Sequence, residues 1–398
     1  MSSTEQLVSY ASDAAASGPA HVEVPVAYDA ILLAGFGGPE GQEDVIPFLR
    51  NVTRGRGIPD ERLEEVAHHY RHFGGVSPIN AQNRALKAAL EEELARRGLR
   101  LPVYWGNRNW APYLTEAVTE AADAGHTTLL GLATSAYSSF SSCRQYREDF
   151  ARALEDSGLA DTVTIDKVRQ YFDHPGFVQP FIDGVRDAVA GFLADGVPAA
   201  SVHVLFSTHS IPTADAQRSG PREGDPRHRD FGEGGAYAAQ HLAVAEVVMA
   251  AVAAEIPEAA DVPWELVYQS RSGPPTQPWL EPDVCDVIEE LPGRGARAVA
   301  IVPVGFMSDH MEVMWDLDTE ALDAAEAAGL RAVRTPTPGI DPVFVSGLVD
   351  LVEERLNGTP AGDRPHKTDL GPWFDVCRTA CCENVRAGFK PAASGLKP

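Results

Sequence analysis

The sequence predicts an α/β fold with two similar doubly wound (Rossmann-like) domains, each built on a four-stranded parallel sheet, and a cleft between them. Two observations lead to this prediction. From Tyr28 onward, short and largely apolar runs alternate with longer helical patterns, which is typical of parallel sheets covered on both faces. The eight apolar runs also divide into two sets of four, and a chain of 398 residues more often forms two domains than one.

The strand candidates of the two halves end in similar ways. They are, in order, residues 30–36, 101–106, 128–135, 163–171, 202–208, 264–270, 298–306 and 330–336. The first strands of the halves end in "GFGGP" and "STHSIP", the second in "GNRNWAP" and "QSRSGP", and the third in "SAYSSF" and "GFMSDH". These parallels suggest an old duplication. They also place polar side chains at the strand ends, where open α/β sheets bind ligands.

Helical patterns fill the stretches between the strands. Clear examples are residues 43–52, 60–73, 83–98 and 180–196. The most apolar pattern, "AYAAQHLAVAEVVMAAVAAEI", is interrupted by Gln240, His241 and Glu246, so it predicts an amphipathic packing helix. Because no run of about 18 uninterrupted apolar residues occurs, we expect no transmembrane segment.

The expected domain organisation has four parts. Residues 1–26 form a flexible tail, 27–172 together with 335–357 form the first domain, 173–334 form the second domain with candidate metal ligands, and 358–398 form a cysteine-bearing extension. The N-terminal residues lack the basic start and apolar core of a secretory signal, so we expect a cytoplasmic protein. The net charge of -24 argues against a nucleic-acid partner, whose phosphates require lysine and arginine.

The segment "VPVGFMSDHMEVMWDLD", residues 302–318, is crowded with acidic side chains. Glu312, Asp316 and Glu320 follow at spacing four, and like charges at this spacing repel on a helix. Either this face is simply solvated or it receives a cation. His209 leaves a buried strand of the same half, and imidazole with carboxylate suits a divalent Fe, Mn or Zn ion or a proton transfer.

Several common site types are absent or incomplete in the sequence. The chain has no HExxH spacing and no P-loop. "GFGG" after the first strand lacks the third glycine of a dinucleotide-binding loop, and "FSTHS" has no G-x-S-x-G frame around its serines. Dinucleotide binding and serine hydrolysis are therefore weakly supported.

Five motifs match a known family when they are taken together and in order. They are "LLAGFGGPE", "FGGVSPIN", "FSTHSIP", "YQSRSGPPTQPWLEPD" and "VPVGFMSDHMEVMWDLD", and through them the chain closely resembles ferrochelatase from Tyr28 to Gly358. The resemblance implies insertion of Fe²⁺ into a porphyrin, the metallation step of haem synthesis, in the cleft of a chelatase-like fold. It also implies a porphyrin substrate and a haem product as partners.

The resemblance assigns roles to the candidate metal ligands. His209 and Glu312 look like the catalytic pair that binds Fe²⁺ and handles the pyrrole protons. Asp316 and Glu320 match further acids on a helix with π character, and they would serve as an auxiliary cation site or as a proton path. The sequence does not choose between these two uses of the acidic residues.

The resemblance assigns the porphyrin-binding wall to Ser77, Tyr146, Phe36 and Arg54. Phe36 stands where bacterial relatives often have tyrosine, and it has no oxygen with which to ligate iron. His209 is therefore the expected ligand of iron in the product complex. The basic loop "RGRG", which contains Arg54, could pair with porphyrin propionates.

The identity of the porphyrin follows from weaker observations. The lack of a membrane segment or an apolar lip favours a water-soluble tetracarboxylate, coproporphyrin III, which would give Fe-coproporphyrin III (coprohaem). Protoporphyrin IX, giving protohaem, is the alternative. A Co²⁺ or Ni²⁺ chelatase and a non-catalytic haem or iron carrier on the same fold remain minor alternatives. We expect a monomer with a transient contact to the next haem-pathway enzyme.

Five cysteines need a separate interpretation. Cys377, Cys381 and Cys382 lie in "CRTACCEN", in a tail whose sparse apolar residues do not predict core packing, and disulfides are disfavoured in a reducing cytoplasm. Four cysteinates suit a [2Fe-2S] cluster or a zinc site. The chain resembles those ferrochelatases, some of them actinobacterial, whose [2Fe-2S] cluster is held by three C-terminal cysteines and one internal cysteine. Cys143 is the internal candidate, and Cys285 is expected to be a buried helix residue.

Overall fold

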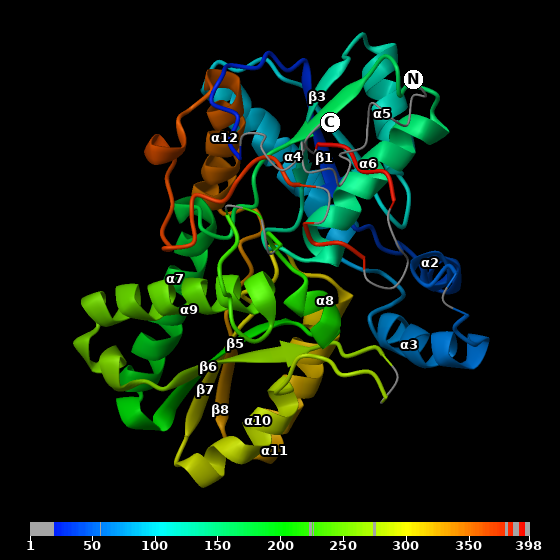
Figure 1. The fold of residues 1–398 in the computed structure, drawn as a ribbon. Helices are drawn as coiled ribbons and strands as arrows, with labels where there is room; N and C mark the ends of the chain where they lie inside the picture. Colours follow the sequence, from blue (N-terminus) through cyan, green and yellow to red (C-terminus); the bar gives the residue numbers. More distant parts are fainter. Residues whose placement is uncertain are drawn as a thin grey trace.

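The computed structural model describes residues 20–55, 57–222, 225, 227–273, 276–378, 381–384 and 390–394. These residues form two four-stranded parallel sheets (Figure 1). The first contains β1 (Ala30–Gly35), β2 (Val103–Asn107), β3 (Thr128–Ala133) and β4 (Thr164–Lys167), in the order β2-β1-β3-β4. The second contains β5 (Val202–His209), β6 (Trp264–Gln269), β7 (Ala298–Val302) and β8 (Arg331–Arg334), in the equivalent order β6-β5-β7-β8. The predicted α/β fold with two similar halves is confirmed.

The strands form because their side chains are buried between layers of helices. Every residue of β1 and of β7 is buried, as expected when both faces of a parallel sheet are covered. The edge strand β8 instead alternates exposed and half-buried residues. All eight predicted strands are present, but β4 ends at Lys167 instead of residue 171, and β7 ends at Val302 instead of residue 306. Pro303 follows it and has no N–H to donate to the ladder.

The helices connect the strands in the predicted alternation. They are α2 (Val45–Val52), α3 (Asp60–His72), α4 (Ile79–Arg96), α5 (Leu114–Asp123), α6 (Gln145–Asp156), α7 (Pro175–Ala194), α8 (Thr213–Gln217), α9 (Gly235–Glu255), α10 (Val284–Glu290), α11 (Leu322–Ala327) and α12 (Pro342–Asn357). α12 shows clear boundary signals. The Asp341 carboxylate accepts hydrogen bonds from the backbone of Val343 and Phe344, and Gly358 ends the helix in the left-handed conformation at φ 62°.

Two short segments form π-helices at equivalent places in the two halves. Phe140–Arg144 follows β3, and Val313–Ala321 follows β7. The second of these carries the acidic residues, as the resemblance implied. π-helical turns are rare and are often found at functional sites, because the wider turn changes which side chains line up.

The two halves share one hydrophobic core. A single cluster of buried side chains runs from β1 of the first sheet to β7 of the second. α12 contacts α4 of the first half and also α7, and Arg97, directly after α4, pairs with Asp350 on α12 at 2.6 Å. α12 thus contacts elements of both halves, and the division of the chain into domains stays a prediction.

The longest apolar helix, α9, packs inside the protein. Among the described residues it is the one helix long and apolar enough to cross a membrane, and 56% of that window is buried within the fold. It contacts α7 and β6. Gln240, which interrupts its apolar pattern, bonds to Ser138 of the first half, where its Nε2 lies 3.0 Å from the serine Oγ.

The two ends of the described chain hold each other in place. The backbone N–H of Val22 donates to the Asp375 carboxylate at 2.8 Å, and the N–H of Asp375 donates to the Ala20 carbonyl at 3.0 Å. Residues 20–26 are thus paired, and the rest of the predicted flexible tail lies outside the described residues. Trp373 and Phe374 are buried in the shared core, so the expectation that the C-terminal extension would contribute little to core packing was wrong.

Candidate active site

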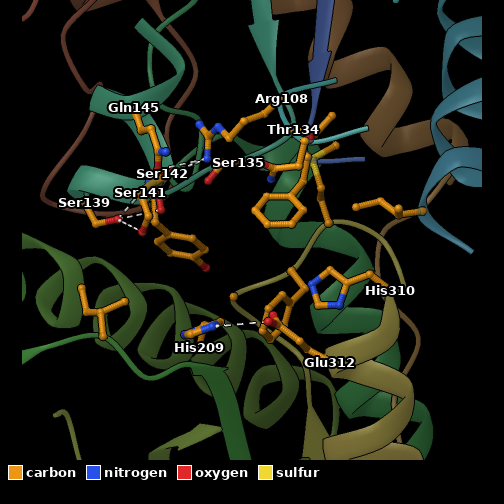
Figure 2. Close-up of a pocket in the computed structure, with 18 of the residues that line it drawn as sticks. Arg108, Thr134, Ser135, Ser139, Ser141, Ser142, Gln145, His209, His310 and Glu312 are labelled. Atoms are coloured by element: carbon orange, nitrogen blue, oxygen red, sulfur yellow. Dashed lines mark hydrogen bonds and ion pairs between the residues drawn. The ribbon is translucent and has the colours of Figure 1, made fainter. Parts of the chain in front are cut away.

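A cavity of about 340 Å³ lies between the two halves. Its lining residues follow β1, β2, β3, β5, β6 and β7, so the carboxyl ends of both sheets face it. Figure 2 shows His209, His310 and Glu312 on the side of the second half, and Arg108 with several serines on the side of the first half. The cleft predicted from the strand ends is present.

β5, which ends at His209, and the segment after β7, which leads to Glu312, approach closely at one glycine. A Cβ atom placed on Gly305, just after β7, would lie 2.9 Å from the Cα atom of Thr208 on β5. Only glycine permits this approach. The loop after β7 can therefore bring Glu312 close to the end of β5, where His209 is located.

His209 is held with one ring nitrogen toward the backbone and the other toward the cavity. Its Nδ1 bonds to the carbonyl oxygen of Ser210. The Tyr237 hydroxyl donates to the backbone carbonyl of His209 at 2.8 Å. A bond at Nδ1 fixes the tautomer and leaves Nε2 for chemistry in the cavity. The His209 side chain is 31% exposed, so a molecule in the cleft can reach it.

Glu312 faces His209 across 3.6 Å, measured from its Oε1 to the imidazole Nε2 (Figure 2). Burial alone lowers the pKa of His209, but the Glu312 carboxylate outweighs this effect and raises that pKa to about 9. Burial alone raises the pKa of Glu312, and the imidazole opposite holds it at about 2. At neutral pH the two groups therefore form an imidazolium–carboxylate ion pair.

His310 is a third titratable group in the cavity, and sequence reasoning gave it no role although it lies in the same acidic segment. Its Nδ1 accepts a hydrogen bond from the Val313 backbone at 3.3 Å, and its ring meets Phe306 edge to face. Burial lowers its pKa, although Glu312 opposes that effect. His310 thus adds a neutral imidazole beside the ion pair.

The acidic segment divides into two sets with different surroundings. Asp309 and Asp318 are both paired with Arg334, with the nearest N–O distances at 3.3 Å and 2.7 Å. Asp316 instead accepts a hydrogen bond from the Ser270 hydroxyl, and burial raises its pKa to about 7 despite that bond. Glu320 is exposed at the far end of the set that begins at Glu312.

Three of the four predicted porphyrin-binding residues line the cavity. Ser77 and Tyr146 are buried there, and Phe36 is 37% exposed and packs edge to face against Phe48. Arg54 is not among the lining residues. It lies in the turn after α2 and donates to the Asn51 side chain at 2.6 Å, so its contact with a propionate stays a prediction.

Arg108 is a lining residue that sequence reasoning noted at a strand end without giving it a role. Its guanidinium lies 4.0 Å from the centre of the Tyr146 ring, forms an ion pair with the buried Asp149, and donates to the Ser141 carbonyl at 3.2 Å. It thereby supports both Tyr146 and the first π-helix from one side. Its position in "GNRNWAP", at the end of a buried strand, was the signal that could have assigned this role.

The four cysteines of the predicted cluster are buried and lie in contact with one another. The Sγ atoms of Cys381 and Cys382 are 3.9 Å apart, and Cys382 also contacts Cys143, while Cys377 contacts Cys381. The contacts therefore connect the four thiols in the order Cys143, Cys382, Cys381 and Cys377. No group of three or more histidine, cysteine, aspartate or glutamate side chains in the described ranges has the arrangement of a metal site. Cys285 is half-buried in α10.

Comparison with known proteins gives a consistent result. The chain is 66% identical over 391 residues to the coproporphyrin III ferrochelatase of Leifsonia xyli subsp. xyli, covering 98% of this chain and 99% of the relative. It is 56% identical to the coproporphyrin III ferrochelatase of Tropheryma whipplei (strain Twist), covering 93% of each. A solved structure of the sirohydrochlorin chelatase SirB from Bacillus subtilis subspecies spizizenii matches 85% of this chain and 98% of its own, with 12% identity and a TM-score of 0.41, which adds nothing to the assignment. The ferrochelatase family profile matches residues 28–356, so this chain belongs to the ferrochelatase family.

Proposed function

We propose that this protein inserts Fe²⁺ into coproporphyrin III to give Fe-coproporphyrin III, with His209 and Glu312 as the catalytic pair. The observation that carries the proposal is the His209–Glu312 pair, which faces a cavity bounded by both halves of a ferrochelatase fold. The printed names of relatives at 66% and 56% identity support the choice of porphyrin.

The site supplies what metallation requires. A free porphyrin carries two N–H protons in the plane that the metal must enter, so the site must accept protons and offer iron from one face. The imidazolium first releases its proton to solvent, which reaches the partly exposed His209 side chain. His209 can then bind Fe²⁺ or take a pyrrole proton through Nε2, and Glu312 stabilises the imidazolium that the proton transfer forms. Asp316, with its pKa near 7, can pass a proton onward at neutral pH.

The wall opposite supports a porphyrin that carries several carboxylates. Arg108, Ser77 and Gln145 line the cavity on this side, and three further serines do so beside the first π-helix: Ser139, Ser141 and Ser142. Hydroxyl, amide and guanidinium groups can donate hydrogen bonds to carboxylate oxygens. Coproporphyrin III has four propionates, against two in protoporphyrin IX, so such a wall favours coproporphyrin III. Tyr146 and Phe36 offer ring surface to the macrocycle.

An anaerobic metallation assay tests this function. Purified protein is supplied with Fe²⁺ and either coproporphyrin III or protoporphyrin IX, and the absorption of the metalloporphyrin is followed. We expect faster metallation of coproporphyrin III, and a loss of at least about 100-fold in rate in His209→Ala and in Glu312→Gln, as for removal of a general base. Tight haem binding without metallation of either porphyrin would instead indicate that the protein is a non-catalytic haem carrier.

We also propose that Cys143, Cys377, Cys381 and Cys382 hold a [2Fe-2S] cluster. The number and the chemistry of the donors suit such a cluster, because four cysteine thiols lie in contact and a cluster of this type takes four cysteinates. Their arrangement among the described residues is not that of a metal site, so the thiols would have to regroup around the cluster. The N–H of Gly220 points at the Cys382 Sγ from 3.1 Å, and such bonds stabilise cluster sulfurs. A bound cluster would cross-link the C-terminal extension to the first π-helix and could carry one electron.

Metal and sulfide analysis with absorption and electron paramagnetic resonance spectra tests the cluster. We expect two irons and two sulfides per chain in protein purified without oxygen, and loss of the signal in Cys382→Ser with Cys285→Ser as the unaffected control. One zinc and no sulfide would identify an all-cysteine zinc site instead. No bound metal would leave the cysteines as core residues.

Other parts of the proposal rest mainly on the sequence and on the family resemblance. They are a cytoplasmic location, a monomeric state, a transient contact with the next haem-pathway enzyme, and the use of Asp316 and Glu320 as a cation site or a proton path. Sedimentation of the purified protein tests the monomeric state. Competition between Fe²⁺ and other divalent ions in Glu320→Gln tests the cation site.

A further inference from the structure

Trp315 joins two parts of the protein that are far apart in the sequence. It lies on the second π-helix, between Glu312 and Glu320, and its ring is surrounded by histidines of α3 in the first half. The indole and the His69 ring are stacked, with their centres 4.1 Å apart and their planes at 6°. His68 and His72 meet the same ring edge to face, at 6.1 Å and 5.6 Å.

α3 and its partner α2 form one wall of the cavity. Phe48 on α2 and Tyr70 on α3 are lining residues, and their ring centres are 5.8 Å apart. The pair has a hydrophobic cluster of its own, apart from the shared core, and Figure 1 shows the two helices at one side of the molecule, away from the first sheet. A contact that ties α3 to the second half therefore helps to fix the position of this wall.

The indole N–H of Trp315 serves a second group. It donates to the Oε1 atom of Glu320 at 2.9 Å, and Glu320 is otherwise exposed. A carboxylate held by one N–H keeps a preferred orientation with its other oxygen free. The Trp315 side chain thus contacts both α3, which helps to form the cavity wall, and Glu320.

We propose that Trp315 is a positioning residue for the metallation reaction, which holds α3 over the porphyrin cleft through its ring and orients Glu320 toward incoming iron through its N–H. The inference rests on the proposed function, and it assigns separate consequences to the two contacts. The ring contact affects porphyrin binding, and the N–H contact affects the supply of Fe²⁺.

Three variants separate the contacts. Trp315→Phe keeps an aromatic ring beside His69 and removes the N–H, whereas His69→Ala removes the stack and keeps the N–H. Trp315→Ala removes both. Trp264→Phe is the matched control, because Trp264 begins β6 and packs edge to face on Phe206, and neither is among the cavity-lining residues.

The measurements are the dissociation constant of metal-free coproporphyrin III, from fluorescence, and the KM for Fe²⁺ at saturating porphyrin. We expect His69→Ala to raise the coproporphyrin dissociation constant about three- to ten-fold, as for loss of an aromatic pair, and to leave the KM for Fe²⁺ unchanged. We expect Trp315→Phe to raise the KM for Fe²⁺ about ten-fold, as for loss of a bond that orients a metal-binding carboxylate, and to leave porphyrin binding unchanged. Equal changes in both quantities in both variants would overturn the inference.

Hydrogen exchange of residues 60–72 in the porphyrin-free protein gives a readout that needs no turnover. His69→Ala and Trp315→Ala should speed exchange in α3, and Trp315→Phe and Trp264→Phe should not. Unchanged exchange in His69→Ala overturns the positioning of α3 whatever the activity. Failure of the wild-type chain to metallate coproporphyrin III overturns the proposed function, and the exchange result then decides the positioning of α3 separately.

Discussion

Glu312 is the main group that keeps His209 protonated, with smaller contributions from the Ser210 carbonyl and from Asp316. The Glu312 carboxylate, 3.6 Å from Nε2, raises the pKa of His209 to about 9 against the effect of burial. We expect Glu312→Gln to bring this pKa below 6.5, because burial then acts with less opposition. NMR titration of the His209 ring checks the shift. Glu320→Gln makes the same charge change farther along the segment and should leave the pKa close to 9.

The sign of this effect matters for iron binding. Fe²⁺ requires an unprotonated Nε2, and the folded protein keeps His209 protonated up to a pKa of about 9. Iron binding at neutral pH must therefore release a proton, and affinity should rise with pH between about 7 and 9. Calorimetry of Fe²⁺ binding in buffers of different ionisation enthalpy measures that proton. Binding with no proton release would show that iron does not use His209 Nε2 at this stage.

At the residue scale, all but one of the residues expected in the catalytic pair and the porphyrin-binding wall lie around one cavity, and their roles stay predictions. His209, Glu312, Ser77, Tyr146 and Phe36 all line one cavity. His209 and Phe36 lie at strand ends, which converge in an open α/β sheet, whereas Ser77 before α4 and Tyr146 on α6 were expected only through the family resemblance. Arg54 was placed there from a basic loop. The orientation of a loop depends on how α2 and α3 pack, and residue types do not reveal that packing.

At the scale of elements, α9 carries a histidine that makes the fold sensitive to acid. His241 is fully buried against Tyr137, with ring centres 3.5 Å apart; its Nδ1–H donates to the Tyr237 carbonyl and its Nε2 accepts from Thr208. Burial lowers the pKa of His241 to about 3. At pH values between about 3 and 6.5, His241 is protonated in the unfolded chain but not in the folded protein. The free energy of unfolding therefore falls as the pH decreases through that range.

Urea unfolding at pH 7 and pH 5 measures this loss. A histidine of this kind lowers the free energy of unfolding by about 1.4 kcal/mol per pH unit below its unfolded pKa. His241→Gln should reduce the difference between the two pH values, even if it lowers stability at pH 7. The buried His174, whose pKa is also lowered to about 3, remains in that variant and keeps part of the acid dependence. An unchanged difference would contradict the assignment to His241.

Elements differed in how well the sequence revealed them. Strands such as β1 and β7 could be predicted from the sequence, because a strand that is buried along its whole length is a continuous run of apolar residues. The π-helix at Phe140–Arg144 was not predicted, since one extra residue per turn over five residues leaves no periodic signal. The π character of Val313–Ala321 was expected only through the family resemblance.

At the scale of the whole molecule, one shared core and the C-terminal extension bind the two halves together. The core cluster includes side chains from both sheets, and also Trp373 and Phe374 of the extension. Arg364 is fully buried in the extension and pairs with Asp375 at 2.7 Å, and Asp375 in turn bonds to Val22. The sparse apolar residues of this tail did not predict core packing, because the sequence does not show which few side chains of such a segment become buried.

Because both halves and the C-terminal extension share one core, we expect the protein to unfold in one step and the extension to contribute to its stability. Trp373→Ala removes a large side chain that is 4% exposed, so we expect the free energy of unfolding to fall by about 3 to 5 kcal/mol. Val333→Ala on β8, where the residue is 40% exposed, is the control and should change stability by less than about 1 kcal/mol. Circular dichroism and tryptophan fluorescence during urea unfolding should report coincident transitions in both variants. Two separate transitions, with only one of them shifted by Trp373→Ala, would show that the halves unfold independently and that the extension belongs to one of them.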